Sequence, residues 1–166
     1  MPTANSIALR GVVVEDFCNY KLPSMFLISS YCDWKCCHEA NIDESVCQNH
    51  GLVSGLIKQY SYDSIHQAYI NNPITKAIVI GGLEPMLQID EIIGLIKFFR
   101  KNQCNDPFVI YTGYYPSEIQ DCVSKLKNFN NIIIKYGRYV PNAKSRYDDV
   151  LGITLISDNQ YAEVLC

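Results

Sequence analysis

Long apolar runs are missing from this sequence of 166 residues. A helix that spans a bilayer needs about 20 consecutive apolar residues, and no stretch approaches that length. The opening residues, MPTANSIALRGVVVEDF, contain a short apolar patch but no basic segment followed by a hydrophobic core, so they do not resemble a signal peptide. Repeats, low-complexity stretches and linkers are also missing. We therefore expect a single domain over residues 1–166, a cytoplasmic location and no membrane partner.

An excess of positive charge is missing as well. The formal net charge is −3 and the isoelectric point is near 5.5. Binding to a phosphate backbone requires clustered Lys and Arg, whereas the basic runs here, such as residues 144–146, are short and are typical of a solvated surface. We expect no nucleic-acid partner.

The sequence also lacks a CxxC pair, which is the usual element of structural zinc sites and of thioredoxin-like redox motifs. It nevertheless contains eight cysteines, four of them between residues 29 and 48. Because cytoplasmic thiols stay reduced, this number indicates metal or redox chemistry rather than a disulfide framework.

The spacing of these thiols leaves the type of site open. Three residues separate Cys32 from Cys36, and ten separate Cys36 from Cys47. Three thiolates with one open position suit an iron–sulfur cluster, whereas zinc requires a fourth ligand, which His38 or His50 could supply. Spacing alone permits a cluster, a zinc site or no metal.

Segments typical of strands and helices alternate along most of the chain. Strands are predicted over residues 25–29, 75–82, 107–113, 131–137 and 149–157, and helices over residues 61–72, 89–102 and 116–128. Short links between such elements favour an α/β domain with a parallel sheet and right-handed crossovers. The cysteines follow the first of these strands, so they would lie at the carboxyl ends of the strands, where α/β folds carry their sites.

Two further strand ends carry candidate site residues. Gly81 and Gly82, in VIGGLEPMLQ, allow the backbone to approach a ligand closely, and Glu84 adds a carboxylate. Thr112 and Gly113 end the next predicted strand. Each could be an ordinary strand-end turn. Beside a cysteine-rich loop, we interpret them as further walls of one pocket.

Four segments, in this order, resemble the radical S-adenosylmethionine superfamily, and specifically the activating proteins of anaerobic ribonucleotide reductases. The segments are CDWKC, GGLEP, YTGYYPSEI and KYGRYV…LGITLISDNQ, and the resemblance covers nearly the whole chain. The fold that it implies is a parallel sheet forming a small partial (βα) barrel.

The resemblance also implies cofactors, partners and residue roles. It implies a 4Fe–4S cluster with one open iron, held by Cys32, Cys36 and Cys47, and S-adenosylmethionine held by Gly81, Gly82 and Glu84, with Thr112 and Gly113 lining the pocket. The implied activity is an oxidoreductase that generates a glycyl radical on a glycyl-radical enzyme such as anaerobic ribonucleoside-triphosphate reductase. A low-potential electron donor such as flavodoxin would reduce the cluster.

The sequence departs from the family pattern at two positions. The third cysteine of CxxxCxxC would fall at residue 39, which is Glu39, so we interpret Cys47 as the third ligand and Cys37 as the alternative. Leu83 is inserted into the family's GGEP motif. Two other functions stay open: a radical enzyme with another substrate, and a non-catalytic protein, either an iron–sulfur electron carrier or a zinc-stabilised interaction module.

Overall fold

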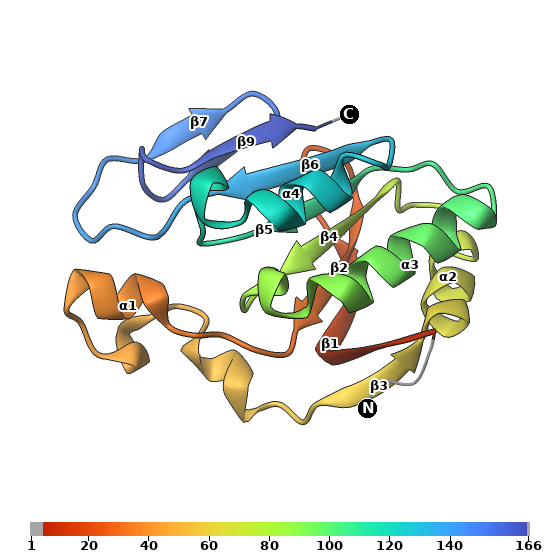
Figure 1. Ribbon diagram of the computed structural model, residues 1–166, viewed down its shortest axis with the longest axis horizontal. Coiled ribbons are helices and arrows are strands. Elements are labelled where there is room, and N and C mark those ends of the chain that lie inside the picture. The colour runs from red at the N-terminus through yellow and green to blue at the C-terminus, as the bar shows by residue number, and fades with distance from the viewer. Residues whose placement is uncertain (1–4, 166) are drawn as a thin grey trace.

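The computed structural model describes residues 5–165, and its centre is a seven-stranded sheet (Figure 1). The strand order is β3-β1-β2-β4-β5-β6-β9. These strands are β1 (Ser6–Asp16), β2 (Ser24–Ser29), β3 (Lys58–Ser61), β4 (Ala77–Gly81), β5 (Phe108–Tyr111), β6 (Ile132–Tyr136) and β9 (Tyr161–Val164). The four strands β2, β4, β5 and β6 pair in parallel, while β1, β3 and β9 add antiparallel pairs at the two sides. The fold is mixed α/β, and the curvature of a partial barrel stays a prediction.

The α-helices are α1 (Lys35–Ala40), α2 (Tyr62–Ile70), α3 (Ile89–Lys101) and α4 (Gln120–Leu126), and the 3-10 turns are η1 (Glu44–Val46), η2 (His50–Ser54), η3 (Pro85–Gln88) and η4 (Pro116–Glu118). The three predicted helices are confirmed as α2, α3 and η4 with α4, whereas the sequence does not predict α1 and the turns η1, η2 and η3. The Ser61 hydroxyl accepts a hydrogen bond from the Ser64 N–H and caps α2. Within residues 5–165, none of these helices combines the length and the apolar content that crossing a membrane requires.

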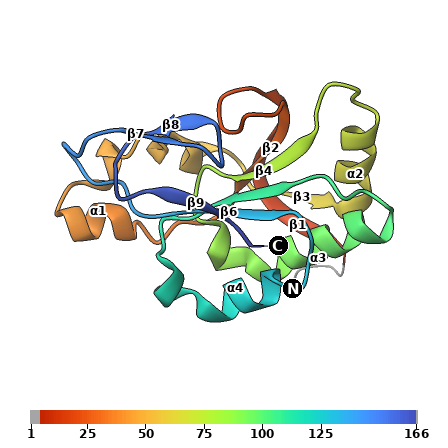
Figure 2. The ribbon, with the colours of Figure 1, turned by 90° about the horizontal axis from the view of Figure 1, so that it is seen from above.

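Both faces of the sheet are covered, and the alternation of side chains along the strands explains how. Ile78 and Ile80 of β4 pack into the larger core together with α2, α3 and α4, while Ala77 and Val79 pack into a smaller core on the opposite face. That opposite face is covered by a hairpin of β7 (Arg146–Asp148) and β8 (Ile153–Leu155). Figure 2 shows α3 and α4 on one side of the sheet and the hairpin on the other.

The predicted strand over residues 149–157 is wrong: the extended segment is shorter and does not join the main sheet. Residues 149–152 form a turn in which Gly152 has a φ of +71°. The buried Asp148 carboxylate holds this turn by accepting hydrogen bonds from the backbone N–H groups of Leu151 (3.0 Å) and Ala162 (2.9 Å). Only Ile153–Leu155 is extended, and it pairs with β7 instead of joining the main sheet.

The parallel pairing brings three loops to one edge of the sheet. The loops that follow β2, β4 and β5 all leave from carboxyl ends, so they are neighbours in space although they are far apart in sequence. The Ser29 hydroxyl donates a hydrogen bond to the Gly81 carbonyl (2.9 Å) and ties the ends of β2 and β4 together.

Candidate metal centre

Four cysteines line one pocket at this edge of the sheet. Cys32 lies in the loop after β2, Cys36 and Cys37 lie on α1, and Cys47 directly follows η1. The rest of the pocket wall consists of Asp33, Trp34, Lys35, Glu84, Gly113, Tyr114 and Arg138. The cysteine loop and the ends of β4 and β5 therefore contribute to one site, as the sequence predicted.

Arg10 of β1 fixes both ends of the cysteine-rich segment. Its guanidinium donates hydrogen bonds to the carbonyls of Ser30 (3.0 Å), Val53 (2.7 Å) and Gly55 (2.6 Å). Gln88 supports the same point, since its side-chain carbonyl accepts from the Ser30 N–H (2.7 Å). Charge-assisted hydrogen bonds from Arg10 thus hold together the two ends of a segment that contains only short helical elements.

Burial favours the protonated form of three pocket thiols, Cys32, Cys36 and Cys37, in the absence of a metal. It raises the pKa of Cys32 to about 12 and also raises the pKa values of Cys36 and Cys37. Two backbone N–H groups oppose this effect: Trp34 donates to Cys32 Sγ (3.4 Å), and Tyr139 donates to Cys36 Sγ. Binding a metal must therefore release protons, and preformed N–H···S bonds would then stabilise the thiolates.

The described side chains of the pocket are not grouped around a single metal position. Within residues 5–165, no three His, Cys, Asp or Glu side chains are close enough to share one metal ion. Ligands of one zinc ion lie within roughly 4.6 Å of each other, twice the Zn–S distance of about 2.3 Å, whereas a cluster takes one thiolate for each iron and spreads its ligands around a cavity. The two histidines weighed as zinc ligands are also outside the pocket wall: His38 contacts Glu44 (3.2 Å), and the His50 ring packs against Trp34.

Glu84 is the acid of the pocket, although Leu83 precedes it as an insertion. The Leu83 side chain is itself buried, so the extra residue is absorbed by packing. The Glu84 carboxylate accepts hydrogen bonds from the Thr112 hydroxyl (2.8 Å), the Gly113 N–H (2.9 Å) and the Met86 N–H (3.0 Å). Burial outweighs these three bonds and raises the pKa of Glu84 to about 7.

Gly81 and Gly82 are not among the residues that line the pocket. A Cβ on Gly81 would lie 3.0 Å from Cβ of Tyr111, and one on Gly82 would lie 3.0 Å from Cδ1 of Leu52. Gly82 also has a φ of +82°, a conformation that other residues rarely adopt. The two glycines let the end of β4 turn closely past its neighbours, and a contact between them and a cofactor stays a prediction.

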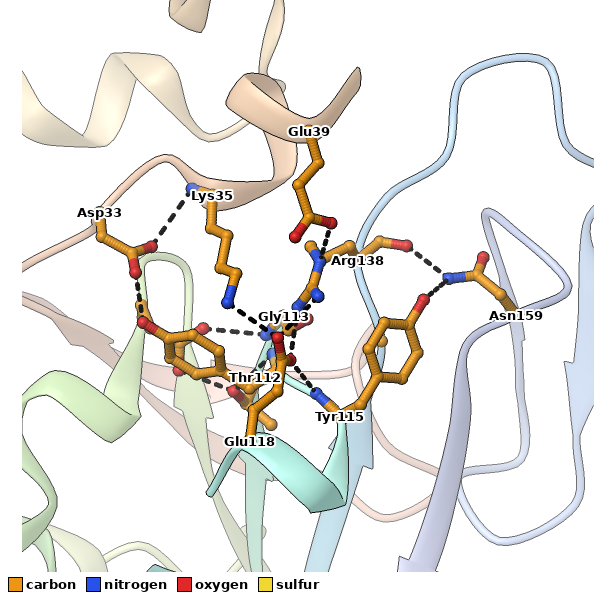
Figure 3. Close-up of polar contacts among 12 residues, drawn as sticks. Asp33, Lys35, Glu39, Thr112, Gly113, Tyr115, Glu118, Arg138 and Asn159 are labelled. Atoms are coloured by element: carbon orange, nitrogen blue, oxygen red, sulfur yellow. Dashed lines mark hydrogen bonds and ion pairs between the residues drawn. The ribbon is translucent and has the colours of Figure 1, made fainter. Parts of the chain in front are cut away.

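A network centred on Arg138 closes the other side of the pocket (Figure 3). The guanidinium forms a bidentate ion pair with Glu118 (2.7 and 2.8 Å), contacts Glu39 on α1 and donates to the Gly113 carbonyl (3.1 Å). Lys35 also binds Glu118 (2.8 Å). The hydrogen bonds from Arg138 and Lys35 lower the pKa of Glu118 strongly, and the two carboxylates raise the pKa of Arg138.

The comparison with known families decides the type of centre. The profile of the 4Fe-4S single cluster domain family matches residues 24–160, from the first residue of β2 to the residue before β9. The chain belongs to this family. Comparisons with curated proteins and with solved structures give no match. A 4Fe–4S cluster is therefore the cofactor indicated for the thiol pocket.

Within this 4Fe–4S domain, the ligand assignment is still a prediction from the sequence. Cys32, Cys36 and Cys47 all line the pocket, and so does the alternative ligand, Cys37. The thiol groups of Cys37 and Cys47 form a hydrogen bond with each other, and Cys37 is the more deeply buried of the two. Glu84 and Gly113 lie on the wall beside the thiols, whereas Thr112 acts through its hydrogen bond to Glu84.

Sequence reasoning missed Arg10, Lys35, Glu118 and Arg138. Arg138 belongs to the segment KYGRYV, which carries part of the family resemblance, but its partners Glu118 and Glu39 lie 20 and 99 residues away. Arg10 likewise acts 20 to 45 residues from its own position. No local spacing rule connects residues at such separations.

Proposed function

We propose that this protein is a radical S-adenosylmethionine activase, an oxidoreductase that generates a glycyl radical on a partner such as anaerobic ribonucleoside-triphosphate reductase. The observation that carries the proposal is the sharing of one pocket by the cluster thiols and the Glu84 carboxylate. An electron carrier needs the thiols alone. An enzyme that binds an amino acid-derived cofactor at an open iron needs an acceptor group beside the cluster.

Glu84 has capacity left for such a ligand. An ionised carboxylate offers about four lone-pair positions, and three are used: Oε1 accepts from Met86 and Thr112, and Oε2 accepts from Gly113. The remaining position on Oε2 would accept an N–H of the methionine amino group. Because Thr112 and Gly113 fix the carboxylate, little conformational freedom would be lost on binding.

The thiols would have a complementary task. In the proposed assignment Cys32, Cys36 and Cys47 each hold one iron, which leaves the fourth iron open to the amino and carboxylate groups of S-adenosylmethionine. When bound and reduced by a donor such as flavodoxin, the cluster would supply the electron that cleaves the sulfonium bond to methionine and a 5′-deoxyadenosyl radical. Transfer of a hydrogen atom from the partner's glycine to that radical would give 5′-deoxyadenosine and the glycyl radical. Trp34 and Tyr114 line the same pocket and would limit the access of water.

The test is anaerobic reconstitution followed by electron paramagnetic resonance of the reduced protein, with and without S-adenosylmethionine. We expect the cofactor to change the spectrum, and we expect 5′-deoxyadenosine to be detected by chromatography after reduction. Glu84→Ala should abolish both effects while the iron content is retained, and Glu163→Ala, at an exposed position of β9, is the matched control. A cluster whose spectrum ignores the cofactor, with no cleavage, would leave only an electron carrier.

A further inference from the structure

The Arg138 side chain is almost fully buried, and its polar contacts connect several elements of the fold. Its side chain joins three separate elements: Glu39 of α1, Glu118 of η4 and the carbonyl of Gly113 after β5. Its guanidinium also stacks on the Tyr115 ring, 4.7 Å from the centroid. Figure 3 shows these groups converging on the guanidinium from different elements.

The backbone around Arg138 is itself held firmly. Gly137 has a φ of +106°, and a Cβ there would lie 3.1 Å from the carbonyl oxygen of Asn159. The Asn159 amide donates to the Arg138 carbonyl (2.8 Å) and to the Tyr115 hydroxyl (2.8 Å). The SDNQ segment therefore anchors the main chain from which both the Arg138 side chain and the Tyr139 N–H reach the pocket.

The contacts of Arg138 meet those of Cys36 and Glu84 at one residue, Gly113. A Cβ on Gly113 would lie 3.1 Å from Cys36 Sγ, 3.6 Å from Glu84 Oε2 and 3.8 Å from Cγ of Arg138. These distances leave little room for a side chain at position 113, so the groups approach one another closely there, and the position of α1 determines how Cys36 faces Glu84. Arg138 fixes that position through Glu39, and the Tyr139 N–H fixes the Cys36 sulfur directly.

We propose that Arg138 is a positioning residue that holds α1 against Gly113 and thereby sets the place of the Cys36-bound iron relative to Glu84. The proposal rests on the proposed function in treating Cys36 as a cluster ligand and Glu84 as the acid that binds the cofactor. A role as an anion-binding residue is disfavoured, because Glu39 and Glu118 already balance the Arg138 charge. Glu39 stands where the CxxxCxxC pattern would place its third cysteine, so this position serves the Arg138 network while a later thiol completes the ligand set.

The geometry requires Arg rather than Lys. Nη1 and Nη2 bind the two Glu118 oxygens, Nη1 also reaches the Gly113 carbonyl, and Nε points to Glu39. A Lys ammonium is a single point charge on a flexible stem and does not reproduce a planar set of donors. Arg138→Lys therefore keeps the charge and loses the positioning, whereas Arg138→Met loses both.

The first measurement uses the cluster-free protein, so that it does not depend on radical chemistry. Hydrogen exchange of the α1 amides should accelerate at least about tenfold in Arg138→Met and in Arg138→Lys, since each variant loses charge-assisted hydrogen bonds. The amides of α3 should be unchanged. Arg100→Lys is the matched control, because Arg100 also stacks on a ring, Phe108, and donates to carbonyls, but it does so away from the pocket.

The second measurement uses the reconstituted protein. The g-values and the midpoint potential of the cluster should change in both Arg138 variants and stay at the wild-type values in Arg100→Lys. Unchanged α1 exchange, or complete restoration of exchange and spectrum by Arg138→Lys, would overturn the proposal.

If Arg138→Met does not fold, the Glu39→Gln variant provides the test instead. This substitution weakens only one contact of the network, and that contact is half exposed. It should accelerate exchange in α1 by about twofold to fivefold, and exchange equal to wild type would refute the positioning role. If the wild-type protein produces no 5′-deoxyadenosine while the variants show the expected changes in exchange, the proposed function is refuted and the role of Arg138 stands.

Discussion

Glu84 should make the stability of the cluster-free protein depend on pH in an unusual direction. Burial raises the pKa of Glu84 from 4.5 to about 7 in the folded protein. Between these two values the folded state binds a proton that the unfolded state has lost. A carboxyl group of this kind stabilises the fold at low pH, and that stabilisation is lost as the pH rises through 7. Replacing it by Gln, a neutral side chain of similar shape, removes the titration.

The magnitude follows from the two pKa values. At pH 8 the carboxyl is ionised in both states and contributes almost nothing to the pH dependence. At pH 6 about nine-tenths of the folded molecules carry the proton while the unfolded chain is ionised, and the gain in stability is about 1.4 kcal/mol, the value of one pKa unit. The difference in unfolding free energy between wild type and Glu84→Gln should therefore shift by about 1.4 kcal/mol from pH 8 to pH 6, in favour of the wild type.

Lys135 should enlarge this shift. Burial lowers its pKa to about 8, and the nearby Glu84 charge opposes that lowering. In Glu84→Gln the pKa of Lys135 falls further, so the variant loses additional stability as the pH is lowered through this range. The two contributions have the same sign, and 1.4 kcal/mol is accordingly a lower bound in this scheme.

The assay is urea denaturation of anaerobically purified, cluster-free protein at pH 6, 7 and 8. Taking the difference between the two proteins cancels the histidines and the exposed groups that both contain. Glu163→Gln is the control and should unfold in parallel with wild type at every pH. A constant difference between wild type and Glu84→Gln across this range, or one that grows with pH, would refute the assignment of a raised pKa to Glu84.

Three further perturbations test the cysteine pocket. Cys47→Ala should remove most of the reconstituted iron and sulfide while Cys37→Ala retains it; the reverse result would make Cys37 the third ligand. Arg10→Ala should accelerate proteolysis within residues 44–55 at least about tenfold, because it removes the charge-assisted hydrogen bonds that close this segment, and an unchanged rate would contradict that role. Lys135→Met should lower the midpoint potential of the cluster by tens of millivolts, since a buried positive charge near Cys36 is lost; an equal or higher potential would contradict it.

The sequence predicted the elements that alternate regularly and missed those that do not. The β4, β5 and β6 strands are short apolar runs buried on both faces, and α3 has a continuous apolar stripe, so simple periodicity identifies them. The first four residues of β1 are all buried, and register shifts interrupt its pairing with β2 after Leu9 and after Val13. Such interruptions destroy the period of two. The edge strands β3 and β9 are short and half exposed, so they carry little pattern.

The residues of the candidate site likewise include some that the sequence predicts and some that it does not. Cys32, Glu84 and Gly113 lie two or three residues after strand ends, and the rule that parallel strands present their carboxyl ends at one edge places them together. The supporting residues do not follow this rule. Arg10, Glu118 and Arg138 support the pocket from β1, η4 and the loop after β6, and the hydrogen bonds of Arg10 and the Arg138–Glu118 ion pair depend on the tertiary structure alone.

The structure shows how the chain accommodates its two departures from the radical S-adenosylmethionine pattern that the sequence resembles. Leu83 lengthens the turn after β4, but its side chain is buried and Glu84 still reaches Thr112 and Gly113. Glu39 replaces a thiol, and its carboxylate pairs with Arg138 at the pocket wall. A third ligand at Cys47, as proposed, would lengthen the loop, which costs little because closure entropy grows only logarithmically with length. Two turns, η1 and η2, and the hydrogen bonds of Arg10 order that longer loop. The pattern is therefore altered at two positions, and in both cases the fold supplies a compensating contact that leaves the thiols and the acid in one pocket.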